Sequence, residues 1–229
     1  MAVCSNCGAE VASGAGFCQA CGHSLRTRDV GWNYRISPTR IMVMSALTWS
    51  IYLFYWMYIT WKHYRDHTGE EVFPVWHALA TGLPIYGYFR VHAHARSYKE
   101  LIARADIPNS IDPRNVVIGV IAYSAVGYIE NSMAWGEITQ TIANVLLLMD
   151  ILSVVIVAWL LLHLQENINR YWYAVSNGAL QDARFGVGEV ILAILGVLLW
   201  FDTFSNVLSS EYRSGYEFAT TLVRCCVAG

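Results

Sequence analysis

Four cysteines in two close pairs open the chain, and their spacing carries a readable chemistry. Two residues separate the members of each pair, and the pairs flank residues 8–17: Cys4, Cys7, Cys18 and Cys21. Four thiolates at this spacing are the tetrahedral ligand set that Zn²⁺ takes in structural sites. Gly8 and Gly22 follow the second cysteine of each pair, where a positive φ turns backbone N–H groups toward the sulfurs without steric cost. The sequence therefore predicts one structural zinc ion, held by these cysteines in a small zinc-ribbon β-hairpin.

The same cysteines allow two other readings, a pair of disulfides or a redox dithiol. Disulfides need an oxidising compartment, and we expect none because no secretory signal precedes the first pair. A redox site uses one Cys-x-x-Cys motif near a βαβ pattern, not two facing motifs. A catalytic zinc needs an open coordination position, which four thiolates do not leave. Because the head has little apolar surface, metal binding is expected to supply its folding energy.

Composition indicates that the rest of the chain is embedded in a membrane. The 229 residues are 55% hydrophobic and 14% charged, with a mean hydropathy of +0.37, whereas ordinary soluble domains carry about 25% charged residues. The 9 tryptophans and 14 tyrosines are typical of rings at membrane interfaces. A large soluble all-α protein is the alternative, but apolar runs of about 20 residues argue against it. A net charge of −2 gives no indication of nucleic-acid binding.

Apolar runs predict an all-α polytopic membrane domain of four to five helices. The expected spans are residues 41–61, 73–89, 116–134, 141–164 and 188–208. Prolines and glycines interrupt the second run, so we expect a short broken helix that leads into a basic helix ending near Pro108. Residues 165–184 read as a polar loop. The expected organisation is a ribbon at 1–25, a basic linker at 26–40, a transmembrane domain at 41–210 and a tail at 211–229.

Positive charges predict the orientation of the chain. Arginines cluster in residues 26–40, just before the first span, which favours a cytosolic N-terminus and agrees with reduced thiols. Five spans would place the C-terminus outside, but Lys62 and Arg65 would then face outward against the positive-inside rule. A re-entrant second segment or an interfacial third segment would reduce the count to four.

Ionisable residues inside spans are the candidate sites of the membrane domain. Asp150, Glu189 and His77 lie within or at the start of apolar runs, and such residues are costly in hydrocarbon and indicate function by default. Asp150 is the best buried of these and could hold a proton or cation. The alternative is a helix-packing hydrogen bond to a neighbouring span. Other ionisable groups are expected at span ends in water: Glu130, His163 and Asp202.

Histidines in the polar extension of the first span and in the basic helix after the second run suggest a weaker site. His63 and His67 are four residues apart on a helical extension and so share a face. Together with His92 and His94 they could bind a second metal, although the sequence places no further ligand. The alternative is that all four are interfacial side chains.

Two stretches resemble known prokaryotic segments. Cys4-Ser-Asn-Cys7-Gly-Ala-Glu-Val, followed by Phe17-Cys18-Gln-Ala-Cys21-Gly, resembles the short zinc ribbon at the N-terminus of many bacterial membrane proteins. Thr48-Trp-Ser50-Ile-Tyr-Leu-Phe-Tyr-Trp56 is similar to the opening span of an uncharacterised bacterial and archaeal membrane family that reads Thr-x-Gly-Ile-Tyr-x-x-Tyr-Trp, with Ser50 in place of glycine. The segment 167–172 also resembles a late part of such proteins. The resemblance implies this architecture and a prokaryotic inner-membrane protein, and it implies no activity.

No Ser-His-Asp order, phosphate-binding glycine loop or His-Glu-x-x-His motif is present. The sequence therefore favours a non-enzymatic membrane protein whose cytosolic ribbon docks a protein partner, as a subunit or accessory factor of a membrane complex. The first alternative is a small transporter or channel built on the broken second helix and Asp150. A membrane enzyme that uses the histidines is a further alternative.

Overall fold

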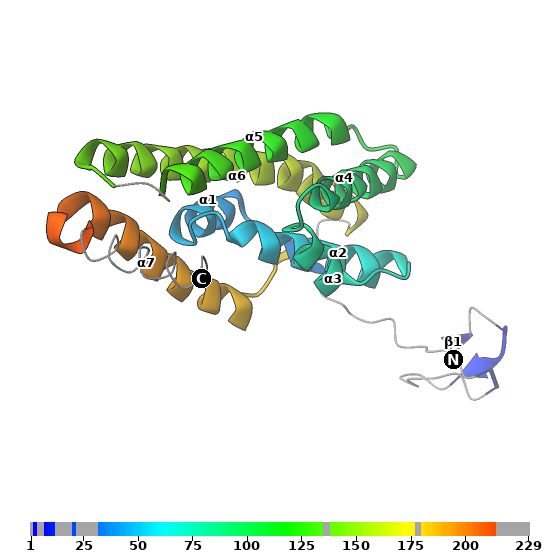
Figure 1. The fold of residues 1–229 in the computed structure, drawn as a ribbon. Coiled ribbons are helices and arrows are strands. Elements are labelled where there is room, and N and C mark those ends of the chain that lie inside the picture. The colour runs from blue at the N-terminus through cyan, green and yellow to red at the C-terminus, as the bar shows by residue number, and fades with distance from the viewer. Residues whose placement is uncertain are drawn as a thin grey trace, which may run out of the picture.

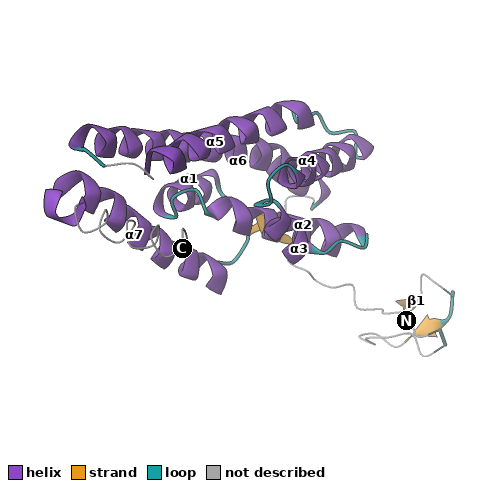
Figure 2. Ribbon diagram, viewed as in Figure 1, coloured by secondary structure: helices purple, strands orange, loops and turns teal. Residues whose placement is uncertain are grey.

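The computed structural model describes residues 2–3, 7–11, 20–21, 32–134, 138–176 and 180–213 and is mostly helical (Figure 2). The helices are α1 Pro38–Leu47, α2 Tyr52–Thr68, α3 Pro74–Ala80, α4 Tyr86–Arg104, α5 Pro113–Ala134, α6 Gln140–Val175 and α7 Val187–Leu208. The strands are β1 Ala2–Val3, β2 Glu10–Val11, β3 Trp32–Arg35 and β4 Leu180–Asp182. The described part of the chain thus has more helices than the four to five expected, because two predicted segments are broken.

The predicted hairpin of the head is present around the first cysteine pair. Strands β1 and β2 pair antiparallel, with Ala2 opposite Val11 and Val3 opposite Glu10. Gly8 has φ 73°, which confirms the predicted left-handed turn after Cys7. Cys4, Cys18 and Gly22 lie outside the described residues.

Three described helices, α5, α6 and α7, are long and apolar enough to cross a membrane. They run along the long axis of the helical body (Figure 1). The predicted third and fifth spans agree with α5 and α7. Helix α6 has 36 residues and is therefore about 54 Å long, well beyond a hydrocarbon core of about 30 Å.

The polar loop predicted at 165–184 is wrong in its first half, because α6 continues to Val175. The polar side chains there are satisfied by tertiary partners instead of water. Gln165 Oε1 accepts from Trp56 Nε1 at 2.7 Å, and Asn167 Oδ1 accepts from the backbone N–H of Ser110 at 2.9 Å. Asn169 Nδ2 donates to the carbonyl of Ile36 at 2.8 Å. These residues keep the helix intact and attach it to its neighbours.

The first predicted span, 41–61, is not one helix. It breaks at residues 48–51, where Trp49 and Ser50 have φ of 52° and 68°. Thr48 Oγ1 donates to the carbonyl of Met44 at 2.7 Å and accepts from the N–H of Tyr52 at 2.9 Å, so one hydroxyl satisfies backbone groups on both sides of the break.

Helices α1 and α2 therefore form a helical hairpin that enters and leaves at one end of the bundle. Arg40 at the start of α1 and Tyr52 at the start of α2 both bond Glu189, in the first turn of α7. The turn between them lies farther along α7, where Gly196 packs on the backbone of Thr48. A Cβ at Gly196 would lie 2.4 Å from Thr48 Cα, so only glycine allows this approach. Helix α1 lies between α6 and α7 (Figure 1).

The predicted break in the second apolar run is present at residues 81–85, between α3 and α4, where Ile85 has φ 62°. Gly82 in this turn packs on the ring of Phe54. Large apolar side chains point outward around the turn, with Trp76 69% and Ile85 71% exposed. The arrangement is a second hairpin with an apolar outer face.

Strand β3, which precedes α1, pairs with strand β4, which precedes α7. The pair lies at the end of the helical body where both hairpins begin. The two strands are parallel, with Trp32 opposite Leu180 and Arg35 opposite Asp182. The N–H of Ala183 then donates to the carbonyl of Arg35 at 2.7 Å. This pairing places the start of α1 beside the start of α7. We call this end of the molecule the strand end.

Candidate functional site

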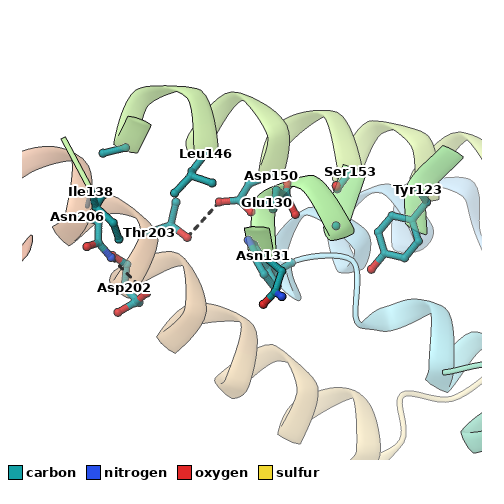
Figure 3. A pocket seen from close by; sticks show the side chains of 13 residues that line it. Tyr123, Glu130, Asn131, Ile138, Leu146, Asp150, Ser153, Asp202, Thr203 and Asn206 are labelled. Carbon is teal, nitrogen blue, oxygen red and sulfur yellow. Dashed lines mark hydrogen bonds between the residues drawn. The ribbon is translucent and has the colours of Figure 1, made fainter. Parts of the chain in front are cut away.

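A cavity of about 410 Å³ lies between α5, α6 and α7 at the tip of the α1–α2 hairpin. Figure 3 shows the side chains that line it. Three carboxylates face the cavity, Glu130 from α5, Asp150 from α6 and Asp202 from α7. None of the described residues that line it is a lysine or an arginine. The lining is therefore suited to a cation.

Asp150 is the most deeply placed of the three carboxylates, at 6% exposed. Its Oδ2 accepts a hydrogen bond from Thr203 Oγ1 at 3.3 Å (Figure 3). Asp202 lies nearer the end of α7, where its Oδ1 accepts from the hydroxyl of Tyr212 at 2.8 Å. Arg213 is close in sequence but donates to backbone carbonyls of Asn206 and Val207, capping α7.

Several buried polar atoms around the cavity lack a hydrogen-bond partner: Trp49 Nε1, Glu130 Oε1, Ser153 Oγ and Asn206 Oδ1. Ser153 faces Glu130 and Trp49 faces Asp150, but neither pair closes into a hydrogen bond of normal geometry. Ser153 is only 7% exposed, so bulk water does not satisfy its hydroxyl. Buried polar groups are normally paired. These atoms therefore leave hydrogen-bonding capacity for water or a ligand in the cavity.

The break in the first apolar run places an aromatic ring in this cavity. Trp49 adopts a left-handed conformation, which costs a non-glycine residue about 1–2 kcal/mol. The same conformation sets its indole in the cavity wall, beside Asp150. Backbone strain of this kind is concentrated at binding sites.

The cavity extends toward the end of the bundle opposite the strand end. Its lining there includes Asn131 near the end of α5, Ile138 just before α6 and Asn206 near the end of α7. In the other direction it is closed at Tyr123. Beyond Tyr123 lies a space of only about 10 Å³ between Trp56 and His94, at the lower limit for one water molecule. Tyr123 thus separates the cavity from this small space, and it also borders a hollow of about 760 Å³ beside the turn between α3 and α4.

The structure does not bring together the three residues that the sequence grouped as an intramembrane site. Asp150 lines the cavity, whereas Glu189 is 0% exposed and pairs with Arg40 near the strand end. His77 lies in α3, edge-on to Trp61 at 4.8 Å between ring centroids. Of these residues, only Asp150 belongs to the cavity.

The second metal site expected from His63, His67, His92 and His94 has no structural support. No group of three or more metal-binding side chains converges within the described residues. His63 packs on the ring of Tyr34, His67 Nε2 bonds the hydroxyl of Tyr171 at 2.8 Å, and His94 Nε2 bonds Thr60 Oγ1 at 2.8 Å. Burial lowers the pKa of His67 and lowers that of His63 to about 3. His63, His67 and His94 are therefore held in separate packing and hydrogen-bonding contacts and do not form one site.

Sequence reasoning assigned Glu130 and Asp202 to water at span ends and did not single out Trp49 or Ser153. The structure places all four around Asp150. The signal that the sequence did carry is that each of the three long apolar helices contains a carboxylate within its apolar run: Glu130, Asp150 and Asp202; α6 and α7 each carry one more, Glu166 and Glu189. The common depth of the first three depends on helix register, which an apolar pattern does not fix.

At the head, Cys7 and Cys21 are exposed, one from each cysteine pair. Together with the left-handed turn at Gly8, this agrees with a thiolate zinc site. No curated protein and no solved structure matches the chain. Residues 3–25 match the family model of the zinc-ribbon domain, which indicates a zinc-binding head on a helical membrane protein.

Proposed function

We propose that this protein is a small transporter or channel that takes a monovalent organic cation into the cavity around Asp150. The observation that carries the proposal is a cavity that combines three carboxylates and unpaired buried polar atoms with no basic lining residue. An ionisable residue facing a cavity in a membrane domain is by default functional.

The size and lining of the cavity favour an organic cation over a bare metal ion. A volume of about 410 Å³ is that of a small-molecule pocket. The carboxylates line different walls, and no metal-binding cluster occurs among the described residues. Apolar side chains of Ala143 and Leu146 and the rings of Trp49 and Tyr123 complete the wall. Aromatic faces beside carboxylates attract organic ammonium groups through cation–π contacts.

The distribution of basic residues supports an orientation with the strand end in the cytosol. Every described lysine and arginine except Arg213 lies on the elements gathered at the strand end. The α1–α2 reversal brings Lys62 and Arg65 back to that side, which removes the conflict with the positive-inside rule that five full spans created. In this orientation the end of the cavity at Asn131, Ile138 and Asn206 lies toward the outside, and Tyr123 lies toward the cytosol.

Uptake of radiolabelled tetraethylammonium into proteoliposomes tests the proposal. We expect Asp150→Asn to reduce uptake at least tenfold, because the cation loses its deepest charge partner. Glu166→Gln is the matched control, since it removes an exposed carboxylate from the same helix outside the cavity. Uptake that equals that of empty liposomes, or that is the same in both variants, would contradict the proposal.

The zinc ribbon supports a second role, which is compatible with the first. We propose that Cys4, Cys7, Cys18 and Cys21 hold one structural Zn²⁺ and that the resulting cytosolic head docks a protein partner, as in an accessory subunit of a prokaryotic inner-membrane complex. Four thiolates leave no open position for chemistry, so the head is a non-enzymatic module. Deletion of residues 1–25 should abolish co-purification of the partner and leave cation uptake unchanged. An unchanged set of co-purified proteins would contradict docking by the head.

A further inference from the structure

A second hollow lies at the strand end, where α7 begins. It has a volume of about 610 Å³ and is lined by Tyr55, Tyr58 and Lys62 of α2, by residues 183–188 before and within α7, and by Asn33 of β3. It shares no lining residue with the cavity around Asp150. We call it the basic hollow.

The basic hollow has an unbalanced positive charge. Lys62 and Arg184 both line it, and neither forms an ion pair with an acid of the described residues. The nearby acids are already engaged: Asp182 with Arg35 at 3.4 Å, Asp66 with Arg65 at 2.9 Å, and Glu189 with Arg40. The hollow therefore attracts an anion that the described part of the chain does not supply.

The position of the basic hollow corresponds to the level of lipid headgroups. Helix α7 is a candidate membrane span that begins at Val187, which is 77% exposed, and the preceding Phe185 is 67% exposed. Tyr55 and Tyr58 lie on the opposite wall. Apolar and tyrosine side chains beside two cations at the end of a span are typical of the membrane interface. Basic pockets between helices on the cytosolic side bind acidic headgroups.

We propose that the basic hollow binds the phosphodiester group of an acidic phospholipid, with phosphatidylglycerol as the probe. Lys62 and Arg184 pair with the phosphate, and the amide of Asn33 and the hydroxyl of Tyr58 lie on the same hollow for hydrogen bonds to the headgroup. Phe185 and Val187 face the acyl chains. The exposed apolar flank distinguishes this site from one for free phosphate. The proposal stands independently of the cation cavity.

Lipid titration of the purified full-length protein, read by native mass spectrometry, tests this site. We expect phosphatidylglycerol to bind more tightly than phosphatidylcholine, and the double variant Lys62→Gln/Arg184→Gln to weaken phosphatidylglycerol binding at least tenfold. The matched control is Arg96→Gln/Lys99→Gln, which removes two exposed cations from α4. A far-UV circular dichroism spectrum and a Tm equal to those of the wild type show that the variant is folded.

Two outcomes would overturn the proposal. One is phosphatidylglycerol binding that is unchanged by Lys62→Gln/Arg184→Gln, or that falls equally in the α4 control, because the lipid would then respond to net charge alone. The other is complete displacement of the lipid by excess inorganic phosphate, which would identify a site for the free anion.

Discussion

Arg40 and Glu189 are 149 residues apart in the sequence and form a buried ion pair, with Arg40 Nε donating to Glu189 Oε1 at 2.8 Å. Their side chains are 7% and 0% exposed. The hydroxyl of Tyr52 donates to the same oxygen at 3.2 Å. The pair thus fixes both arms of the α1–α2 hairpin on the first turn of α7 and sets how far the hairpin tip reaches toward Asp150.

Replacing one partner of this pair should strongly destabilise the protein. Arg40→Ala leaves the Glu189 carboxylate buried without its cation, which costs about 3–5 kcal/mol. Arg35→Ala is the control, because its pair with Asp182 is 50% and 63% exposed and such pairs contribute about 0–1 kcal/mol. Thermal unfolding in detergent measures both. Equal shifts in Tm for the two variants would contradict a structural role for the Arg40–Glu189 pair.

Ser50→Gly should stabilise the protein by about 1 kcal/mol. Ser50 has φ 68°, a conformation that glycine takes without strain, and its hydroxyl is buried without a partner. Both costs disappear in the variant. Ser45→Gly is a useful contrast, because Ser45 is equally buried but lies inside α1, where glycine costs about 1 kcal/mol. A lower Tm for Ser50→Gly than for the wild type would contradict the left-handed turn.

Acidification should destabilise the region around α2. Burial, together with the positive charges of Lys62 and Arg40, lowers the pKa of His63 to about 3 against the opposing effect of Asp66, while an unfolded histidine has a pKa of about 6.5. Below pH 6.5 the unfolded chain therefore binds a proton that the folded chain does not, and the stability that neutral His63 allows at pH 7 is lost as pH falls. From pH 6.5 to 5 the loss is about 2 kcal/mol.

His63→Phe isolates this contribution, since the ring still packs on Tyr34. We expect a smaller fall in Tm between pH 7 and pH 5 in the variant than in the wild type. Identical pH profiles would mean that His63 is protonated at no cost in the folded state.

Zinc content should depend on the cysteines of the head alone. Cys7→Ser and Cys21→Ser should each lower the zinc bound per chain from one to well below one, because structural sites with three thiolates bind weakly. Cys225→Ser lies outside the ribbon and should keep full zinc. Elemental analysis of the purified proteins measures this. Full zinc in either ribbon variant would exclude four-thiolate binding.

Apolar length was sufficient to predict α5 and α7, and the prolines and glycines of 73–89 were sufficient to predict the break between α3 and α4. The break at Thr48–Ile51 contains neither proline nor glycine, and its one local signal is that the pattern this stretch resembles has glycine at the position of Ser50. Close contact with Gly196 and the double role of the Thr48 hydroxyl stabilise it, and both depend on tertiary structure.

Dependence on tertiary structure also explains why the sequence predicted only part of the candidate site. Asp150 was identifiable because it interrupts an otherwise apolar run. Glu189 also interrupts an apolar run, but it is a structural residue that pairs with Arg40 from another segment. A single sequence shows that a charge is buried and does not show whether a counter-charge accompanies it.

Equilibrium binding of tetraphenylphosphonium to the purified protein tests the cation cavity most directly. We predict one site per chain, with affinity at least tenfold lower in Asp150→Asn and in Glu130→Gln and unchanged in Glu166→Gln. Binding that is absent in the wild type, or that keeps full affinity in the double variant Asp150→Asn/Glu130→Gln, would contradict the proposed site.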